Sequence, residues 1–353
     1  MFGRRLIKSN DEGGGASFNT VTYTGNGSTQ SITGVGFQPD FVWIKSRSAT
    51  TSHKLTDIVR ATTKGLVSNT AAAETTDSNG LTAFGSDGFT LGTDSVYNNS
   101  GATYVAWCFR AGGSSISNTN GSITSNVSKN NIAGISIVKY TGTGTAATIG
   151  HGLDVAPSLI IIKNLDSTTD WYVYSSGLTS NAYYLKLNSQ SSEASDSTVF
   201  NSTSPTSTVF SIGTSTGTNG VNSLIAYCFS EISGFSKIGS YTGNGNGSFD
   251  STGLVIAQTI TTGFEPAFVM IRKTNSAEQW MIFDNKRGGS SPGSEWLFLF
   301  ANLSNSEANS QSGGGYSQLV SYTSTAFTLG NDPSLQVNAS GDTYIYMAFA
   351  NQF

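Results

Sequence analysis

The side chains that could do chemistry are few, and their spacing brings no obvious set of them together. The chain has two histidines, His53 and His151, and a zinc site would need three or four closely spaced ligands. Cys108 and Cys228 occupy the same place in two similar segments, so we interpret them as small buried side chains in separate cores. The sequence therefore predicts no disulfide, no metal site and no cofactor.

Carboxylates are the next candidates, because a pair of them can act as acid and base on a glycosidic bond. Asp170, Asp284 and Glu295 are available, but Asp170 aligns with Gln279 in a later repeat, so the acid is not a repeated feature. No G-x-S-x-G segment lies between a strand pattern and a helix pattern. We therefore expect a protein that is not an enzyme and has no catalytic residues.

Two clusters have the appearance of binding loops. The segment YTGNG at 23–27 is similar to a phosphate-binding loop, but a strand pattern follows it instead of a helix, so we interpret it as a hairpin turn. The segment DNKRGG at 284–289 holds the densest charge outside the N-terminus. We interpret it as a solvated loop, with a recognition loop as the alternative.

Composition excludes several classes of protein. The 353 residues carry a net charge of −4, and only 11% of them are charged, so nucleic-acid binding has no electrostatic basis. The apolar runs are too short to insert into a membrane. The abundance of Ser, Thr, Asn and Gly would fit disorder, but 20 Phe, 14 Tyr and 5 Trp provide enough apolar surface for a core. We expect a folded all-β chain.

The elements that must position any site recur three times along the sequence. Five landmarks keep their order: a Tyr-Thr-Gly turn, a Gly/Pro-led apolar run that ends in a base, an aromatic strand, an F-x-x-G segment and an apolar closing strand. The closing strands read YVAWCF (104–109), LIAYCF (224–229) and YIYMAF (344–349). In FVWIK at 41–45 both alternating faces are apolar, which predicts a strand covered on both sides.

The repeats predict three tandem homologous antiparallel β-sandwich domains, jelly-roll-like, after a short N-terminal anchor peptide. We expect each domain to have its own core, so that the middle one would fold alone. The predicted segments are an anchor and Gly-rich hinge (1–16), repeat 1 (17–113), a linker (114–132), repeat 2 (133–234) and repeat 3 (235–353).

The N-terminus FGRRLIKSN is basic and partly apolar, and the flexible segment DEGGGA (11–16) follows it. Such a tail can dock into a groove of another protein through its cationic and aliphatic side chains. The predicted partner-docking residues are Arg4, Arg5, Leu6, Ile7 and Lys8.

The pattern YTGNG, then GF-x-P-x-F-V-x-I-K, W-x-x-Y/F-D/S and Y-x-A-Y/W-C-F, resembles a repeated β-sandwich domain family of tailed-bacteriophage virion structural proteins, notably from marine phages and cyanophages. The N-terminal segment resembles an anchor shared among such proteins. The first repeat departs from the pattern, with His53 near the place of the strand's Trp.

The resemblance implies a virion protein assembled in the host cytoplasm, a fibre- or knob-like appendage or a capsid decoration. Its expected partners are other virion proteins, bound through the N-terminal peptide, and a host-surface glycan or protein. We also expect a homo-oligomer, with a trimer as one arrangement. Two alternatives stay open: a carbohydrate-active depolymerase of the host envelope, and a non-viral surface adhesin. Head or tail location is also open.

Overall fold

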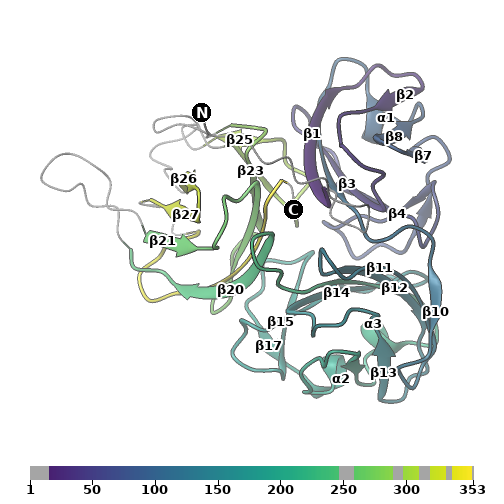
Figure 1. Cartoon of the computed structure of the whole chain (residues 1–353), viewed down its shortest axis with the longest axis vertical. Helices are drawn as coiled ribbons and strands as arrows, with labels where there is room; N and C mark the ends of the chain where they lie inside the picture. Colours follow the sequence, from purple (N-terminus) through teal and green to yellow (C-terminus); the bar gives the residue numbers. More distant parts are fainter. Residues whose placement is uncertain (1–15, 246–257, 289–296, 310–318, 331–335, 352–353) are drawn as a thin grey trace, which may run out of the picture.

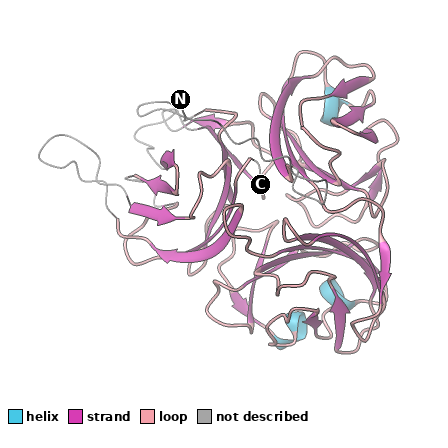
Figure 2. Cartoon of the chain, viewed as in Figure 1, coloured by secondary structure: helices cyan, strands magenta, loops and turns pink. Residues whose placement is uncertain are grey.

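The computed structural model describes residues 16–245, 258–288, 297–309, 319–330 and 336–351. Strands dominate it, and the helices in these ranges are single turns (Figure 2). They are α1 (Ser95–Asn98), α2 (Ser197–Phe200) and α3 (Thr216–Asn219). All strands in the sheets pair antiparallel. The prediction of an all-β fold of antiparallel sheets is confirmed.

Three large sheets form the frame, and we call the chain around them unit 1 (17–113), unit 2 (114–234) and unit 3 (235–351). In unit 1 the order is β1 (Phe18–Thr24), β9 (Thr103–Phe109), β3 (Phe41–Ser46) and β4 (Lys54–Asp57). In unit 2 it is β10 (Ile116–Asn118), β11 (Ser125–Asn130), β12 (Ile135–Thr141), β19 (Ser223–Phe229), β14 (Leu159–Asn164), β15 (Tyr172–Ser175), β16 (Tyr183–Lys186) and β17 (Ala194–Ser195). In unit 3 it is β20 (Ser236–Thr242), β28 (Thr343–Phe349), β22 (Phe268–Lys273), β23 (Met281–Asp284), β24 (Leu297–Phe300) and β25 (Ala308–Asn309).

A small sheet covers the outer face of each large one, which completes a sandwich. In unit 1 it comprises β2 (Gln30–Ile32), β8 (Gly88–Leu91) and β7 (Leu81–Gly85), and β5 (Lys64–Gly65) pairs separately with β6 (Thr75–Thr76). In unit 2 it comprises β13 (Ala147–Gly150) and β18 (Val209–Ile212). In unit 3 it comprises β21 (Gln258–Thr261), β27 (Ala326–Leu329) and β26 (Leu319–Thr323).

The registers show which residues are equivalent among the units. In each large sheet the closing strand lies between the first strand and the Gly/Pro-led strand. The last residue of each closing strand pairs with the first residue of the Gly/Pro-led strand. The pairs are Phe109 with Phe41, Phe229 with Leu159, and Phe349 with Phe268. One alignment therefore relates all three units.

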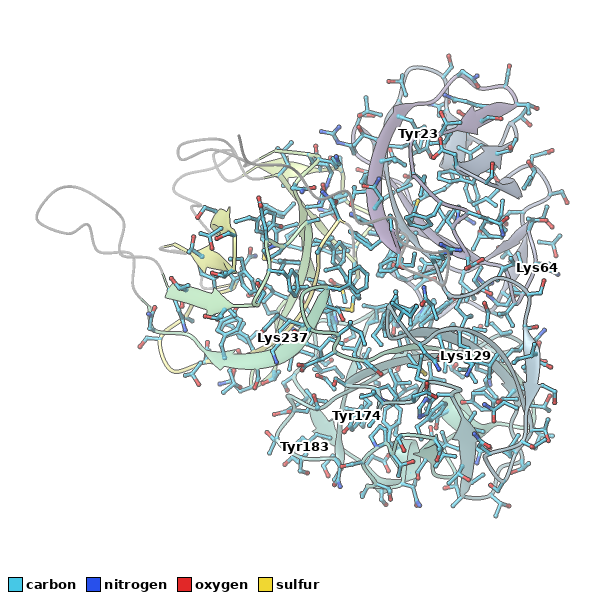
Figure 3. The ribbon with its side chains drawn as sticks, viewed as in Figure 1. Tyr23, Lys64, Lys129, Tyr174, Tyr183 and Lys237 are labelled. Atoms are coloured by element: carbon cyan, nitrogen blue, oxygen red, sulfur yellow. The ribbon has the colours of Figure 1, made fainter. Side chains whose placement is uncertain are left out.

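The inner faces of the three large sheets meet in one shared core. On β3, Val42 and Ile44 face the outer core of unit 1, whereas Phe41 and Trp43 face the centre of the molecule. Figure 1 shows the three units around this centre, and Figure 3 shows side chains filling the space between their ribbons. The second apolar face that the sequence predicts on this strand is thus covered by the neighbouring units.

Three equivalent phenylalanines mark the centre of the molecule. Phe109, Phe229 and Phe349 each end a closing strand, and their ring centroids lie 5.5 to 5.9 Å apart in pairs. The chain therefore has an approximate threefold arrangement built from one polypeptide. The expectation that each repeat has a core of its own is only half right, because every unit also contributes an inner face to the common core.

The segment at 114–132, which the sequence analysis assigned to a linker, contains strands β10 and β11. Strand β11 pairs along the free edge of β12 over six residues, from Ser125 opposite Tyr140 to Asn130 opposite Ile135. Its polar composition hid this role, because an added edge strand needs only alternate apolar side chains. Val127 supplies one of these and is buried in the outer core of unit 2.

The YTGNG turn is not a hairpin, because its two flanking strands lie in different sheets. Strand β1 pairs with β9, whereas β2 pairs with β8. The turn is held by the buried Asn98, whose side-chain oxygen accepts from the Asn26 N–H at 3.0 Å and whose amide donates to the carbonyl of Gly92 in the FTLG segment. Gly25 is required there, since a Cβ would lie 2.3 Å from the Asn99 carbonyl oxygen. The motif is structural.

Candidate functional site: the seams between the units

The polar side chains with specific geometry gather where two units meet. We call these places the first seam (units 1 and 2), the second seam (units 2 and 3) and the third seam (units 3 and 1). At each one, an aromatic N–H from one unit donates to a backbone carbonyl of its neighbour at an equivalent position. The bonds join Trp171 to Val67 at 3.0 Å, Trp280 to Lys186 at 2.9 Å and His53 to Phe300 at 2.8 Å.

His53 therefore occupies the place of the Trp that the first repeat lacks. The indole N–H of Trp43 donates to its Nδ1 at 2.8 Å, which leaves Nε2 as the protonated nitrogen that donates to Phe300. Burial and the nearby Lys45 lower the pKa of His53 to about 3. This neutral imidazole is a structural donor across the third seam.

A second repeated contact is a backbone bond made by three equivalent glutamates, which the sequence analysis did not identify. Each donates its N–H to a carbonyl of the following unit: Glu74 to Leu165, Glu193 to Thr274 and Glu307 to Arg47. The Glu307 carboxylate also binds the Arg47 side chain, with Arg47 Nη2 at 2.8 Å from Glu307 Oε2. An alignment of the three copies on their closing strands would have shown that each copy has a glutamate at the same loop position.

Buried Asp–Arg pairs reinforce two of the seams. In unit 1, Arg60 Nε lies 2.5 Å from Asp57 Oδ2, and both side chains are fully buried. The same carboxylate oxygen accepts from the Tyr227 hydroxyl of unit 2 at 2.7 Å. Burial alone would lower the pKa of Arg60, but the Asp57 carboxylate outweighs it and the pKa lies above its ordinary value. Arg60 is therefore a fixed cation in this contact.

The equivalent pair in unit 3 lies in the segment that the sequence analysis interpreted as a solvated loop. That interpretation is wrong for Asp284 and Arg287, since both side chains are buried with their charged atoms 2.6 Å apart. Asp284 accepts from the Trp107 indole N–H of unit 1 at 2.9 Å, and Arg287 also binds Glu307 at 3.0 Å. Only Lys286 of these charged residues is exposed. The two residues, three positions apart, form a buried ion pair at the third seam.

The second seam has neither the pair nor its donor. Ser175 stands where the other units have Asp, and Leu178 stands where they have Arg. Opposite them, Met347 takes the place of Tyr227 and Trp107. Leu178 and Met347 both belong to the central apolar core. One contact thus occurs in two forms in this chain. At the first and third seams polar side chains face each other, and at the second seam Leu178 and Met347 replace them.

The bases that end the Gly/Pro-led strands are also buried. Lys45 Nζ donates to the carbonyls of Ser46 and Ala49, and Lys163 Nζ donates to those of Asn164 and Ser167. Burial lowers the pKa of each lysine to about 8. The equivalent Arg272 instead reaches across the second seam to the Ser191 carbonyl. These cations hold loops and seams together.

The other residues considered for chemistry do not converge. Asp170 binds Lys186 at 2.7 Å and His151 faces the Thr206 carbonyl, in different parts of unit 2. Cys108 and Cys228 are free and lie in separate outer cores, and burial raises the pKa of both thiols. Glu295 and the predicted docking residues Arg4, Arg5, Leu6, Ile7 and Lys8 lie outside the described residues.

Within the described ranges, no group of three or more His, Cys, Asp or Glu side chains is placed to hold a metal ion. None of the helices found there is long and apolar enough to cross a membrane.

None of the curated proteins that were compared matches the chain. One family does match, described as "Domain of unknown function (DUF7483)", and its match runs from residue 14 to residue 352 without division among the units. This extent fits the shared core and the three seams, which make one body of the repeats. Because the match covers nearly the whole sequence, the chain belongs to the family described as Domain of unknown function (DUF7483).

Proposed function

We propose that this protein is a non-catalytic structural protein of a tailed-bacteriophage particle, anchored by its N-terminal peptide and presenting the three-unit body for adhesion or decoration. The observation that carries the proposal is the closed ring of equivalent seams around the phenylalanine triad. Such a ring is a rigid platform, because each unit is held by both of its neighbours. The resemblance of the repeats to virion domains supports the assignment to a phage particle.

The positions of the chain ends favour a terminal anchor. Phe18, near the start of the described residues, lies 5.5 Å from the Phe349 ring and 4.9 Å from the Phe109 ring. Ala350, near their end, donates its N–H to the Phe235 carbonyl beside the same triad. The described chain therefore both begins and ends beside the centre of the body. An attachment there would leave the outer sandwiches free to meet a host surface.

The use of charge in the described part of the chain favours binding over catalysis. The buried carboxylates of Asp57 and Asp284 are paired with arginines and accept additional hydrogen bonds across their seams. A general acid or base needs a carboxyl that can exchange a proton with a substrate, and these two are committed to the packing of neighbouring units. We therefore propose attachment as the role and place the depolymerase second.

Deleting residues 1–12 tests the anchor. The truncated protein should fold normally but be absent from purified particles, because several charge-assisted contacts of about 1.5 to 3 kcal/mol each would be lost together. The double variant Arg4→Glu, Arg5→Glu should behave similarly. Lys286→Glu is the matched control, since it reverses one exposed charge of the body and should leave incorporation unchanged. Normal incorporation of the truncated protein would refute the anchor.

A further inference from the structure

The second seam contains an open polar groove with a volume of about 290 Å³. One wall is the turn after β15 in unit 2. The other is formed by β20, the start of β28 and the residue after β22 in unit 3. Its lining residues are Gly177, Leu178 and Thr179 on the first wall, and Ser240, Tyr241, Thr242, Thr274 and Thr343 on the second. The groove is large enough for a single sugar ring or a small oligosaccharide end.

Hydroxyl groups dominate this groove. The Thr274 and Thr343 hydroxyls bind each other at 2.6 Å, and Thr179 donates its hydroxyl to the Glu193 carboxylate behind the wall. Ser240 and Thr242 are exposed, and their hydroxyls make no hydrogen bond with any described residue. A hydroxyl both donates and accepts. The groove therefore offers paired donor and acceptor sites at fixed positions on strands.

The charge of the groove narrows the class of ligand. None of the described residues that line it is charged, so a phosphate or a carboxylate would find no counterion in the lining, and the Glu193 carboxylate beside it already accepts from Thr179. Leu178 and Tyr241 are the large side chains of the lining, but Leu178 is buried and the other lining residues are small or carry hydroxyl groups, which disfavours a lipid. A neutral compound that is rich in hydroxyl groups satisfies both conditions.

The first seam provides an internal comparison, because a groove of about 240 Å³ lies at the corresponding place, with Ser115, Thr124 and Asn126 of the segment before β12 as additional lining residues. In that groove Val59 replaces Gly177 and Lys139 replaces Ser240. A side chain at Gly177 would crowd the unit 3 wall, since a Cβ would lie 3.0 Å from that of Ser240. The lining of the second seam is therefore neutral, whereas Lys139 places a cation in the lining of the first.

The strand edge beside the groove also differs between the first and second seams. In unit 2 the edge of β12 is covered by β11, but β20 is the edge strand of its sheet among the described residues. The N–H and C=O of Ser240, which point away from β28, therefore have no strand partner in the part of the chain that the structure describes. They add a backbone donor and acceptor next to the free hydroxyl of the same residue.

We propose that the groove between Gly177, Thr179, Ser240 and Thr242 is a binding site for a neutral saccharide of a cell-surface glycan. The proposal rests on the adhesive role proposed above and gives that role a ligand class and a place. The hydroxyl row would bind the sugar hydroxyls, and the narrow wall at Gly177 would admit the edge of the ring.

Saturation-transfer NMR with the full-length protein tests this site. The probes are glucose, galactose, mannose, N-acetylglucosamine and their disaccharides, with glucuronic acid as a charged probe. At least one neutral probe should bind. Ser240→Lys installs the residue that unit 2 carries at this place, so the fold should tolerate it, and binding should weaken at least about tenfold. The matched control Thr22→Lys places a lysine at the equivalent position of unit 1 and should retain binding.

Three outcomes would overturn the site: no binding of any neutral probe, binding of glucuronic acid alone, or neutral binding that survives Ser240→Lys. Thermal unfolding of Ser240→Lys close to that of the unaltered protein is the check on folding. Failure of the site is distinguishable from failure of the proposed function, because incorporation of Ser240→Lys into particles depends on the N-terminal anchor. A protein that enters particles but binds no saccharide would refute only the groove.

Discussion

The buried pair at the first seam gives the sharpest test of how the units are joined, through the single substitution Arg60→Leu. The Arg60 guanidinium binds Asp57 at 2.5 Å, Glu74 at 3.0 Å and the Leu55 carbonyl at 2.9 Å. Leucine is the residue at the equivalent position of unit 2, so its volume and shape suit the site. The change removes the cation and leaves the Asp57 carboxylate buried.

The expected cost follows from that stranded charge. Removing one partner of a fully buried ion pair destabilises a protein by about 3 to 5 kcal/mol, because the remaining ion lacks compensation. The triple variant Asp57→Ser, Arg60→Leu, Tyr227→Met instead installs all three residues of the second seam. It removes the stranded carboxylate and its donor together, so its stability should lie within about 2 kcal/mol of the unaltered protein.

Urea unfolding followed by circular dichroism at neutral pH measures both free energies. Lys64→Leu is the control, because Lys64 is a half-exposed cation 3.8 Å from Glu74 and should contribute less than about 1 kcal/mol. The reasoning would be refuted if Arg60→Leu cost no more than the control. A triple variant less stable than Arg60→Leu alone would refute the equivalence of the seams.

Three further predictions concern the core, pH and the thiols. The fragment 133–234 should not be a stable monomer, because it would expose inner side chains such as Ile161 and Phe229, each worth roughly 1.5 to 3 kcal/mol of burial; a cooperative monomeric transition by light scattering and calorimetry would contradict this. The pKa of His53 falls from 6.5 to about 3 on folding, so protonation favours the unfolded chain between these values. The contribution of neutral His53 to the free energy of unfolding is therefore complete above pH 6.5 and declines toward pH 3. The loss from this group is at most about 1.4 kcal/mol per pH unit. In His53→Gln the urea midpoint should therefore fall less between pH 6.5 and pH 3, and an unchanged pH dependence would contradict this role of His53. Cys108→Ala should cost on the order of 1 kcal/mol and reductant should change nothing, whereas a native mass lower by two hydrogens would reveal a disulfide.

Two predictions that rest on apolar periodicity and on repeat alignment agree with the structure, whereas the hairpin expected at YTGNG does not. Alternating apolar faces on FVWIK predict a strand covered on both sides, and all six residues of β3 are buried. The equivalent positions of Cys108 and Cys228 predict separate cores, where both thiols lie. Periodicity and repeat alignment carry this information because each rests on neighbours in sequence or on an equivalent position.

The parts that failed depend on partners far away in sequence. A doubly apolar strand does not reveal that its second cover is another unit, so the shared core could not be foreseen from β3 alone. Asp284 and Arg287 read as a solvated loop until Trp107, 177 residues away, is placed against them. The polar residues around β11 resemble a linker because nothing local indicates an open strand edge beside them.

The homo-oligomer expected from the sequence stays a prediction, and light scattering of the full-length protein measures it. One chain of 36.9 kDa already contains a threefold arrangement, so an oligomer would be an assembly of several such bodies. A mass near a single chain would favour attachment to particles as individual bodies.

The central claim is that this protein is a component of a phage particle. Electron cryo-microscopy of particles made with and without the gene, together with mass spectrometry of the purified particles, tests it most directly. We predict that the protein is present in complete particles and that its loss removes a three-lobed density attached at one point. Identical particles in both preparations, with the protein absent from the purified fraction, would contradict the account.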